Sequence, residues 1–465
     1  MRKEGELTVF SSPVFLFAFL PLVFLLERLC PSLRWKNALL AAASLVFYAF
    51  GQLVFLPLFL GSVLLNYLSG LCLMRHPSRR RALLTLAVVL NLLLLGVFKY
   101  GDFVLRNLGQ APVGILLPIG ISFFTFQGMS YVIDVYRDPE SGTADFGKLL
   151  LYLAFFPQLI AGPIVKYHDI APQIDRRQTD PLSTEEGLRR FIRGLGKKLL
   201  IADAVGKIAD AVFAGGTADL RLAWLGAVCY TLQIYYDFSA YSDMAIGMGR
   251  MFGFTFQENF LHPYAAVSLR DFWRRWHVSL SSWFKEYLYI PLGGSRKGKL
   301  RTALNRLLVF LCTGLWHGAN WTFVLWGLGH GLLSSLEGVL PADRLREKPL
   351  GRLLSRVCTL LAVTLLFVVF RAESLSAAWQ MLGAMFAGSL TPEGSVELLR
   401  LLQPAALLTL ALAILFAGGL RERLYARMQG PLFRHLARLG SLALLFLCIL
   451  SLSTGGFHPF LYFQF

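Results

Sequence analysis

The sequence predicts an all-α polytopic membrane protein, and three observations carry this prediction. Of its 465 residues, 55% are hydrophobic and only 16% are charged, with a mean hydropathy of +0.57; soluble proteins carry about 25% charged residues. Apolar runs of helical length recur along the whole chain. Basic residues gather in short stretches between those runs, which is the positive-inside pattern. We therefore expect one integral membrane domain over residues 1–465.

The apolar runs predict roughly nine to eleven membrane crossings at ~20 residues per span. The N-terminal run continues to Glu27 and Arg28 and lacks a small-residue cleavage site, which favours a retained first span over a signal peptide. The other runs lie at about 37–50, 52–74, 82–98, 114–135, 149–165, 222–248, 307–336, 354–370, 401–419 and 441–453.

Two of these runs are poor membrane spans. The run 114–135 contains Pro118 and Gly120, and the run 149–165 contains Pro157 and Gln158. Non-helical backbone at membrane depth is tolerated only where protein buries it or water reaches it. We expect both runs to be broken or re-entrant elements, with Gln158 lining a tunnel; for the first run an ordinary kinked span is an equal alternative.

The net charge of +17 indicates membrane lipids as partners and not nucleic acid. The basic residues occupy four short loops between apolar runs, which we expect to face the cytoplasm and its anionic headgroups: 75–81, 189–198, 296–306 and 421–438. The six cysteines are scattered and no histidine pair has the spacing of metal ligands, so neither a disulfide framework nor a metal site is expected.

The run 230–249 places carboxylates inside an otherwise apolar segment. Asp237 lies one turn from Tyr241, and Ser239 lies one turn from Asp243. Intramembrane carboxylates are costly and usually face a cavity or a partner. The pattern therefore favours a polar tunnel lining, while hydrogen bonding between helices is the alternative.

The stretch from Arg270 to Tyr287 has the spacing of one amphipathic helix. One stripe holds Trp273, Trp276, Leu280, Trp283 and Tyr287; a second holds Arg270, Arg274, His277, Ser281 and Lys285. Tryptophans beside basic side chains are typical of a helix in the membrane interface. Arginine also binds phosphate bidentately, so five residues could instead hold the phosphates of a cytoplasmic acyl donor: Arg270, Arg274, Arg275, Arg296 and Lys297.

The uncharged run 307–336 contains His317, Asn320 and His330. As one straight helix it would be about 45 Å long, which exceeds the roughly 30 Å hydrocarbon core. It must tilt, bend or split, and the Gly-Ala-Asn sequence after His317 is the natural break. Histidine is suited to general base chemistry, although a lone buried histidine is more often structural. His317 and His330 would face opposite ways on a straight helix, so a shared site is not expected unless the break reorients them.

Several long motifs resemble the membrane-bound O-acyltransferase family, and within it the branch that acetylates exported polysaccharides such as alginate. They are VFSSPVFLFAFLPLVF, FFPQLIAGPIVKY, YYDFSAYSDMAIGMGRMFGF, ENFLHPYAAVSLRDFWRRWHVSLSSWFKEYLYIPLGGSRKG, GLWHGANWTFVLWGLGHG and PFLYFQF. The resemblance implies a ring of transmembrane helices around a thin core, with broken helices and interfacial amphipathic helices.

The resemblance also implies site residues and substrates. His317 would be the catalytic histidine and His277 the second histidine of the family signature, with Trp316 and His330 lining the tunnel. The donor would be acetyl-CoA or another acyl thioester, with no bound cofactor. The acceptor would be an exopolysaccharide hydroxyl or a periplasmic acetyl-transfer partner, reached from the bacterial inner membrane. Asn320 or a backbone N–H near the break could stabilise the oxyanion, and an acetyl-histidine relay stays open.

Other interpretations remain at this stage. Lys285-Glu286 stands where the family commonly has Arg-Asp, and His262 departs from the expected polar residue. Seven residues precede Thr8, which suggests an upstream start. D-alanyl transfer and peptidoglycan acyl transfer are rivals on the same fold. A transporter or flippase is a rival of a different class, and a scaffold would need neither histidine.

Overall fold

A computed structural model describes residues 10–216, 218–338, 346–420, 430–454 and 460–461. Within these residues helices are the only regular elements, apart from one isolated bridge between Asp219 and Ser389. The predicted all-α class is confirmed.

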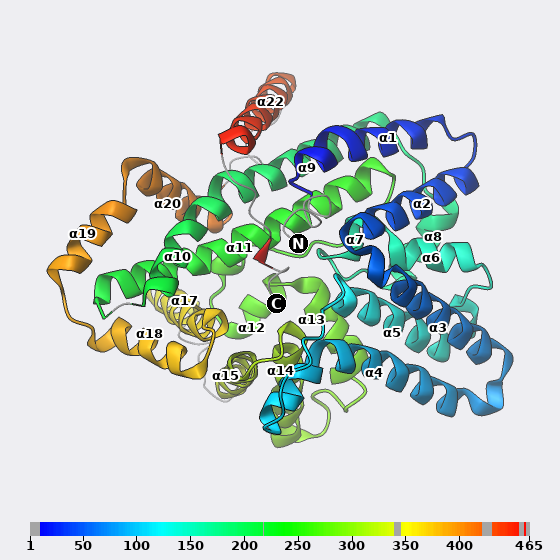
Figure 1. Cartoon of the computed structure of the whole chain (residues 1–465), viewed down its shortest axis with the longest axis horizontal. Helices are drawn as coiled ribbons and strands as arrows, with labels where there is room; N and C mark the ends of the chain where they lie inside the picture. The colour runs from blue at the N-terminus through cyan, green and yellow to red at the C-terminus, as the bar shows by residue number, and fades with distance from the viewer. Residues whose placement is uncertain (1–9, 217, 339–345, 421–429, 455–459, 462–465) are drawn as a thin grey trace. The chain divides into compact units, whose positions relative to one another are not determined.

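The residues group into two compact units. Unit 1 comprises Met1–Gly194, Tyr241–Glu258 and Gly455–Gln464; unit 2 comprises Leu195–Ala240, Asn259–Thr454 and Phe465. The single domain expected for residues 1–465 stays a prediction. Figure 1 shows the helices of both.

Unit 1 consists of short and long helices in chain order: η1 (Phe15–Phe19), α1 (Leu20–Leu29), α2 (Leu33–Gln52), η2 (Leu53–Phe55), α3 (Leu56–Arg75), η3 (Pro77–Arg79), α4 (Arg80–Asn107), α5 (Ile121–Arg137), η4 (Pro139–Ser141), α6 (Phe146–Ala154), α7 (Phe156–Leu159), α8 (Tyr167–Arg176) and most of α9 (Pro181–Gly196).

Unit 2 contains the remaining helices: η5 (Lys197–Ala202), α10 (Asp203–Gly215), η6 (Pro263–Ala265), α12 (Leu269–Arg275), α13 (Val278–Phe284), η7 (Lys285–Tyr289), α14 (Gly298–His317), α15 (Trp321–Glu337), α17 (Pro349–Arg371), α18 (Leu375–Ala387), α19 (Pro392–Leu401), α20 (Pro404–Ala417) and α22 (Pro431–Thr454). The long helix α11 (Leu220–Met251) contributes residues to both units.

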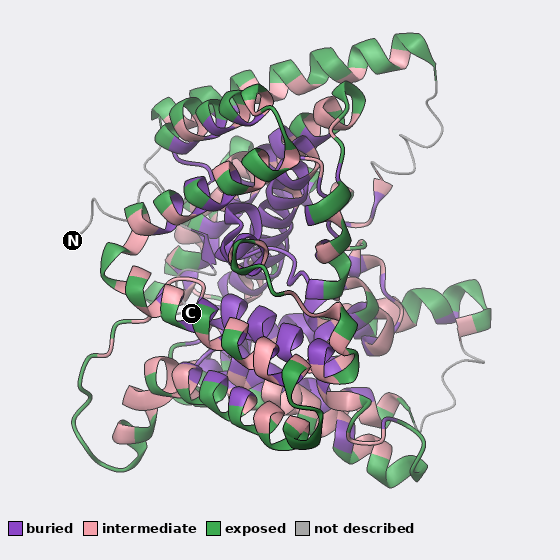
Figure 2. Cartoon of the chain, turned by 90° about the vertical axis from the view of Figure 1, so that its right-hand side faces the viewer, coloured by how far each residue is buried: buried purple, intermediate pink, exposed green. Residues whose placement is uncertain are grey.

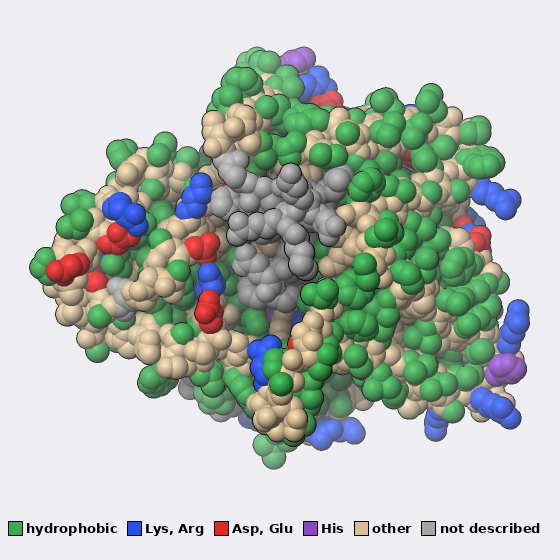
Figure 3. Space-filling view, in the orientation of Figure 1, with side chains coloured by type: hydrophobic (Ala, Val, Ile, Leu, Met, Phe, Trp, Pro, Cys, Tyr) green, Lys and Arg blue, Asp and Glu red, His purple; other side chains and the backbone are tan. Residues whose placement is uncertain are grey.

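Buried polar side chains join neighbouring helices in unit 1. Helix α5 packs against both α3 and α4. Between α3 and α4, the amides of Asn66 and Asn91 donate to each other's oxygens at 3.2 and 3.0 Å, and both side chains are fully buried. Reciprocal amide bonds satisfy polar groups that lipid could not. The face of unit 1 seen in Figure 3 is covered mainly by hydrophobic side chains, with lysines and arginines near its margin.

Fewer helices than expected have the length and composition of a membrane span. Among the described residues four qualify, 33–75, 77–107, 349–371 and 431–454, or five if the bent pair α19–α20 counts as one. The spans 77–107 and 431–454 bury only 17% and 6% of their apolar windows, which suits lipid contact. Figure 2 shows such exposed helices beside segments that are buried throughout.

The count of nine to eleven crossings stays a prediction, because several apolar runs fold in pieces and do not form one long helix each. The first run forms η1 and α1, and a π-helical turn opens into the α-helix there. The run 307–336 divides into two helices. In these cases the apolar composition predicted membrane spans, and local breaks decided the length of each helix.

The two runs predicted to be poor spans are both irregular. In the first, residues 110–118 are non-helical and α5 begins after Gly120, whose φ of +76° is left-handed. In the second, one turn of helix, α7, is followed by irregular backbone over 160–166. All residues from 151 to 167 are buried. Broken elements inside the protein are therefore confirmed for the second run.

The basic stretches were only partly predicted correctly. Residues 75–81 form the exposed connection of α3 and α4, as expected. Residues 189–198 were wrongly expected to be a loop: they continue α9 into η5, and Lys198 is buried in ion pairs. The stretch 296–306 enters α14 at Gly298. Of 421–438, residues 421–429 lie outside the described residues and the rest belongs to α22.

Candidate active site

Helices α14 and α15 form a tightly packed antiparallel hairpin around the predicted break. A Cβ on Gly314 would clash with the carbonyl oxygen of Phe323, and one on Gly327 would clash with that of Phe310. Helix α14 ends at His317, because Gly318 is fully extended with φ −171° and ψ 162°. The run 307–336 is therefore split and folded back on itself. Figure 1 shows the two helices side by side.

His317 is enclosed by aromatic rings. It is 7% exposed, and its ring centroid lies 5.0 Å from that of Trp316, 5.1 Å from Trp326 and 5.2 Å from Phe370. All three contacts are edge-to-face. Trp316 comes from the same helix, Trp326 from α15 and Phe370 from α17. The break thus places His317 in an apolar box built from three helices of unit 2.

His277 lies near this box and is held in one tautomer. Its ring is 5.8 Å from Trp316 and 4.6 Å from Phe238. Its Nδ1 lies 3.2 Å from Oδ1 of Asn259, which also accepts the backbone N–H and the hydroxyl of Ser279 at 3.2 and 2.9 Å. Since that oxygen can only accept, Nδ1 carries the proton and Nε2 presents a lone pair. Burial lowers the pKa of His277 to about 3, so the ring is neutral.

The backbone at His277 overturns the single helix expected from Arg270 to Tyr287. His277 has φ 44° and ψ 54°, and it separates α12 from α13. Only His262 and His277 are non-glycine residues with positive φ among the described residues. A left-handed non-glycine residue is strained and is maintained only by its surroundings, often at functional sites.

The two helical stripes were therefore wrong. The aromatic stripe is at most 8% exposed at each position, so it packs inside the protein instead of lying at the headgroups. The basic stripe does not exist as a face: His277 is fully buried while Arg274 and Lys285 are exposed. A residue with positive φ changes the direction of the chain, and helical spacing no longer predicts which side chains share a face.

His330 reaches the same aromatic cluster from α15. Its ring lies 5.0 Å from Trp326. The indole N–H of Trp273, on α12, donates to Nδ1 of His330 at 3.2 Å. Because the hairpin reverses the chain, Trp326 contacts both His317 and His330. The break thus reorients the two histidines toward one cluster.

Asn320 is engaged at the start of α15. Its Oδ1 accepts the backbone N–H of Thr322 at 3.3 Å as an N-cap, and its Nδ2 donates to the carbonyl of Glu373 at 2.9 Å. Asparagine is a preferred N-cap. These bonds favour a role in fixing the break, and they leave at most one amide N–H for the predicted oxyanion contact.

The five basic residues expected to bind the donor differ in their surroundings. Arg275 pairs with Asp271, one helical turn earlier, at 2.8 Å. Arg270 contacts Glu337 through its backbone N–H and its guanidinium. The other three are exposed: Arg274, Arg296 and Lys297.

The carboxylate of Asp237 belongs to a buried ion cluster in unit 2. Lys198 lies 2.7 Å from Asp237 and 2.8 Å from Asp203, and Lys198 and Asp237 are at most 3% exposed. Nearby, Ser239 accepts from Lys197 at 3.4 Å. This arrangement favours the interhelical role over the tunnel lining for Asp237.

The remaining predicted tunnel residues belong to unit 1. Gln158 is fully buried and donates to the carbonyl of Tyr152 at 2.6 Å. The ring of Tyr241 stacks on Phe10 at 4.5 Å. Asp243 pairs with Arg190 at 2.9 Å. Their lining role stays a prediction.

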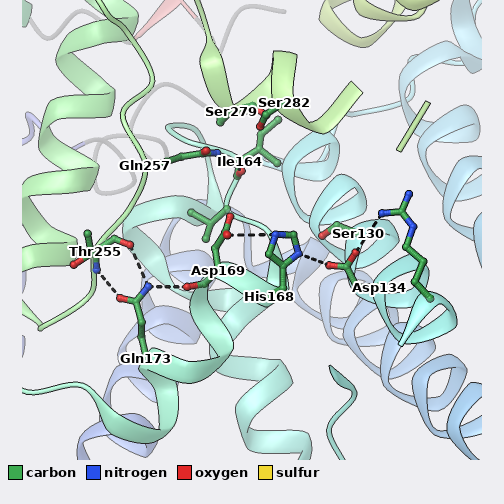
Figure 4. Close-up of polar contacts among 12 residues, drawn as sticks. Ser130, Asp134, Ile164, His168, Asp169, Gln173, Thr255, Gln257, Ser279 and Ser282 are labelled. Atoms are coloured by element: carbon green, nitrogen blue, oxygen red, sulfur yellow. Dashed lines mark hydrogen bonds and ion pairs between the residues drawn. The ribbon is translucent and has the colours of Figure 1, made fainter. Parts of the chain in front are cut away.

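A charged cluster in unit 1 escaped the sequence analysis. The imidazole of His168 lies 2.9 Å from Asp134 and 3.3 Å from Asp169 (Figure 4). Hydrogen bonds to Asp134 and then to Asp169 raise the pKa of His168 to about 10. His168 lies too far along the chain from Asp134 for any spacing rule to join the two residues. Trp326 and Asn259 were missed for the same reason.

Comparison with known proteins places these features in a family context. The model of "MBOAT, membrane-bound O-acyltransferase family" matches residues 41–342, which include His277, His317 and His330. The "Probable alginate O-acetylase AlgI" of Azotobacter vinelandii is 42% identical, with 98% of this chain and 100% of that protein covered. Its namesake from Pseudomonas putida is 41% identical at the same coverage. The "Peptidoglycan O-acetyltransferase" of Helicobacter pylori is 38% identical over 81% of this chain and 79% of that protein.

Proposed function

The chain belongs to the membrane-bound O-acyltransferase family, and from that premise we propose that it acetylates a hydroxyl of an exported, alginate-like polysaccharide. It is a membrane protein and an O-acyltransferase. The observation that carries the choice of acyl group and acceptor is the 42% identity to an alginate O-acetylase over 98% of this chain.

The proposed donor is acetyl-CoA, used at the cytoplasmic side of the bacterial inner membrane. The acetyl group then crosses to a polysaccharide hydroxyl or to a periplasmic acetyl-transfer partner. Arg274, Arg296 and Lys297 are the proposed contacts to the donor phosphates, because their side chains are exposed and arginine matches phosphate geometry.

His317 is the proposed general base. It takes the proton of the acceptor hydroxyl as the oxygen attacks the thioester carbonyl carbon, and it later returns that proton to the leaving sulfur. Two features support this role. His317 ends α14, where the helix dipole favours a positive charge. Three aromatic rings within 5.2 Å can also stabilise the transient imidazolium.

His277 is proposed to orient a substrate group near His317. Its neutral ring presents the Nε2 lone pair, and no hydrogen-bond partner for that atom lies among the described residues. An acceptor atom held in one tautomer can receive the hydroxyl hydrogen of the incoming sugar. Its left-handed backbone indicates that the surrounding structure maintains a strained position there.

The experiment is replacement of His317→Ala in the native host after deletion of the wild-type gene. We expect O-acetyl esters on the exported polysaccharide to be lost while the protein level in the membrane is unchanged. His435→Ala, on the exposed surface of α22, is the matched control and should retain full acetylation. Full acetylation by His317→Ala would reject the base assignment.

The same strains distinguish the rival functions. Loss of acetyl groups from peptidoglycan alone would indicate a peptidoglycan O-acetyltransferase, and loss of D-alanyl esters would indicate teichoic acid chemistry. Labelled acetyl-CoA that the purified protein leaves intact would indicate a carrier-protein donor. A transporter, flippase or scaffold would not depend on His317.

A further inference from the structure

Two buried hydrogen-bond donors near His317 have no acceptor among the described residues. They are the indole N–H of Trp326 and Nε2 of His330. Trp326 is 1% exposed and His330 is fully buried. A buried donor without an acceptor costs roughly 1–3 kcal/mol, so such atoms call for an explanation.

The hydrogen bond from Trp273 determines which ring nitrogen of His330 carries the hydrogen. The indole of Trp273 can only donate, and its N–H is 3.2 Å from Nδ1 of His330. Nδ1 is therefore the acceptor, and the neutral ring carries its hydrogen on Nε2. His330 and His277 are thus fixed in opposite tautomers: His277 presents a lone pair and His330 presents an N–H.

Trp326 packs against the proposed base, and His330 packs against Trp326. Trp326 and His330 are one turn apart on the same face of α15. The ring of Trp326 is 5.1 Å from His317 and 5.0 Å from His330. Elsewhere in unit 2 the indole of Trp224 is satisfied, since it donates to the carbonyl of Met385 at 2.7 Å. These two donors are thus buried in the aromatic cluster that encloses His317.

We propose that Trp326 and His330 donate to the acyl carbonyl oxygen of the donor thioester and form its oxyanion hole. This inference rests on the proposed acetyl transfer. When the acceptor oxygen bonds to the carbonyl carbon, its proton passes to His317 and the carbonyl electron pair moves onto the oxygen that Trp326 and His330 hold. Collapse restores the C=O bond and breaks the C–S bond. His317 then protonates the thiolate, giving an O-acetyl ester and free CoA.

The test compares four variants in membrane vesicles supplied with radiolabelled acetyl-CoA and deacetylated polymannuronate oligosaccharide. Trp326→Phe keeps the ring and removes the N–H. His330→Leu removes the donor, whereas His330→Gln retains an N–H near the position of Nε2. Trp224→Phe is the matched control, because it removes an indole N–H that is already bonded to backbone. Rates are divided by the amount of folded protein, measured by size-exclusion chromatography.

We expect Trp326→Phe and His330→Leu each to lower kcat by about 10²-fold, the usual loss for one oxyanion donor. The KM for acetyl-CoA should change little, since the bond strengthens in the transition state. His330→Gln should recover at least about tenfold over His330→Leu. Trp224→Phe should keep its kcat.

Other outcomes separate this inference from the proposed function. Wild-type kcat in Trp326→Phe, or equal losses in His330→Leu and His330→Gln, would overturn the oxyanion hole. If His317→Ala retains activity while Trp326→Phe loses it, His317 is not the general base. The assignment of Trp326 and His330 as the oxyanion hole would then still hold. A wild-type protein that transfers no acetyl group from any thioester, in vesicles or in the host, would overturn both.

Discussion

The rings of His317 and Trp326 come from opposite sides of one helix break, yet their centroids lie 5.1 Å apart. The contact exists because α14 and α15 fold back on each other through Gly314 and Gly327. Trp326 also contacts His330 at 5.0 Å. The helix break after His317 therefore brings the residues of the candidate site together.

The Gly314 contact predicts a large stability effect from a small substitution. Gly314→Ala places a methyl group against the carbonyl of Phe323, and we expect it to destabilise the protein by roughly 1–3 kcal/mol because packed backbones cannot separate freely. Gly383→Ala on α18 is the control, since no atom lies within 4 Å of its Cβ position. There the gain in helix propensity should stabilise by about 0.5–1 kcal/mol. Thermal unfolding in detergent measures both, and equal shifts would contradict the close packing.

The tautomer of His277 predicts a difference between two variants of Asn259. Asn259→Ala removes the acceptor that holds Nδ1–H, and we expect kcat to fall by about tenfold or more. Asn259→Asp keeps an acceptor oxygen at the same place and should lose less. Initial rates per folded molecule measure the effect, with unfolding temperatures as a check on folding. Equal losses in the two variants would argue against tautomer control.

Because Lys198 and Asp237 form a buried ion pair, we expect that breaking it lowers the stability of the protein and leaves its catalytic activity unchanged. Asp237→Asn removes one of the two carboxylates that compensate a buried ammonium, so the unfolding temperature should fall. Both kcat and KM per folded molecule should stay within about twofold. In the control Asp210→Asn, which breaks an exposed pair with Arg371, stability should change by less than about 1 kcal/mol. A raised KM for Asp237→Asn would instead indicate that Asp237 lines the substrate tunnel.

If the exposed basic residues bind the donor phosphates, their replacement should weaken the binding of acetyl-CoA but not of a donor without phosphates. Replacing Arg274, Arg296 and Lys297 together by alanine should raise the KM for acetyl-CoA about tenfold, because charge-assisted bonds to phosphate are lost. Acetyl-pantetheine lacks those phosphates, so variant and parent should have the same KM for it. Arg352→Ala on the exposed side of α17 is the charge control. An unchanged KM for acetyl-CoA would show that these three residues do not bind the donor phosphates.

The pKa of His168 predicts a stability difference that fades at high pH. Its pKa rises from 6.5 to about 10 beside Asp134 and Asp169, so the folded state binds a proton that the unfolded state releases. The stabilisation is complete below the unfolded value near 6.5 and disappears as pH rises through about 10. The unfolding temperature of His168→Gln should therefore fall below that of the parent most strongly near pH 6 and match it above pH 10. A gap that is constant with pH would contradict this, and His76→Gln on the surface should show no gap.

The sequence predicted the class of the protein and the position of the break for local reasons. Apolar composition excludes a soluble protein whatever its fold. The segment from His317 to Asn320 stops a helix by itself, since Gly318 accepts extended backbone and Asn320 caps the next helix. The family resemblance, confirmed by the comparisons, directed attention to His317 and His277.

The prediction of helix faces from residue spacing was wrong where the chain turns between Trp276 and Val278. Helical periodicity assigns side chains to faces only while the helix continues, and the left-handed His277 ends that continuity. The stripes predicted from Arg270 to Tyr287 were lost there, and the aromatic residues became part of the core.

An α-helical membrane acyltransferase with a histidine at a helix break could thus be predicted from the sequence, because these properties depend on composition, motifs and neighbouring residues. The other features of the site required the three-dimensional structure. It paired Asp237 with Lys198, fixed His277 and His330 in opposite tautomers, and brought Trp326 against both His317 and His330. Hydrogen bonds and ring contacts between separate helices set these features, and sequence spacing carries no information about them.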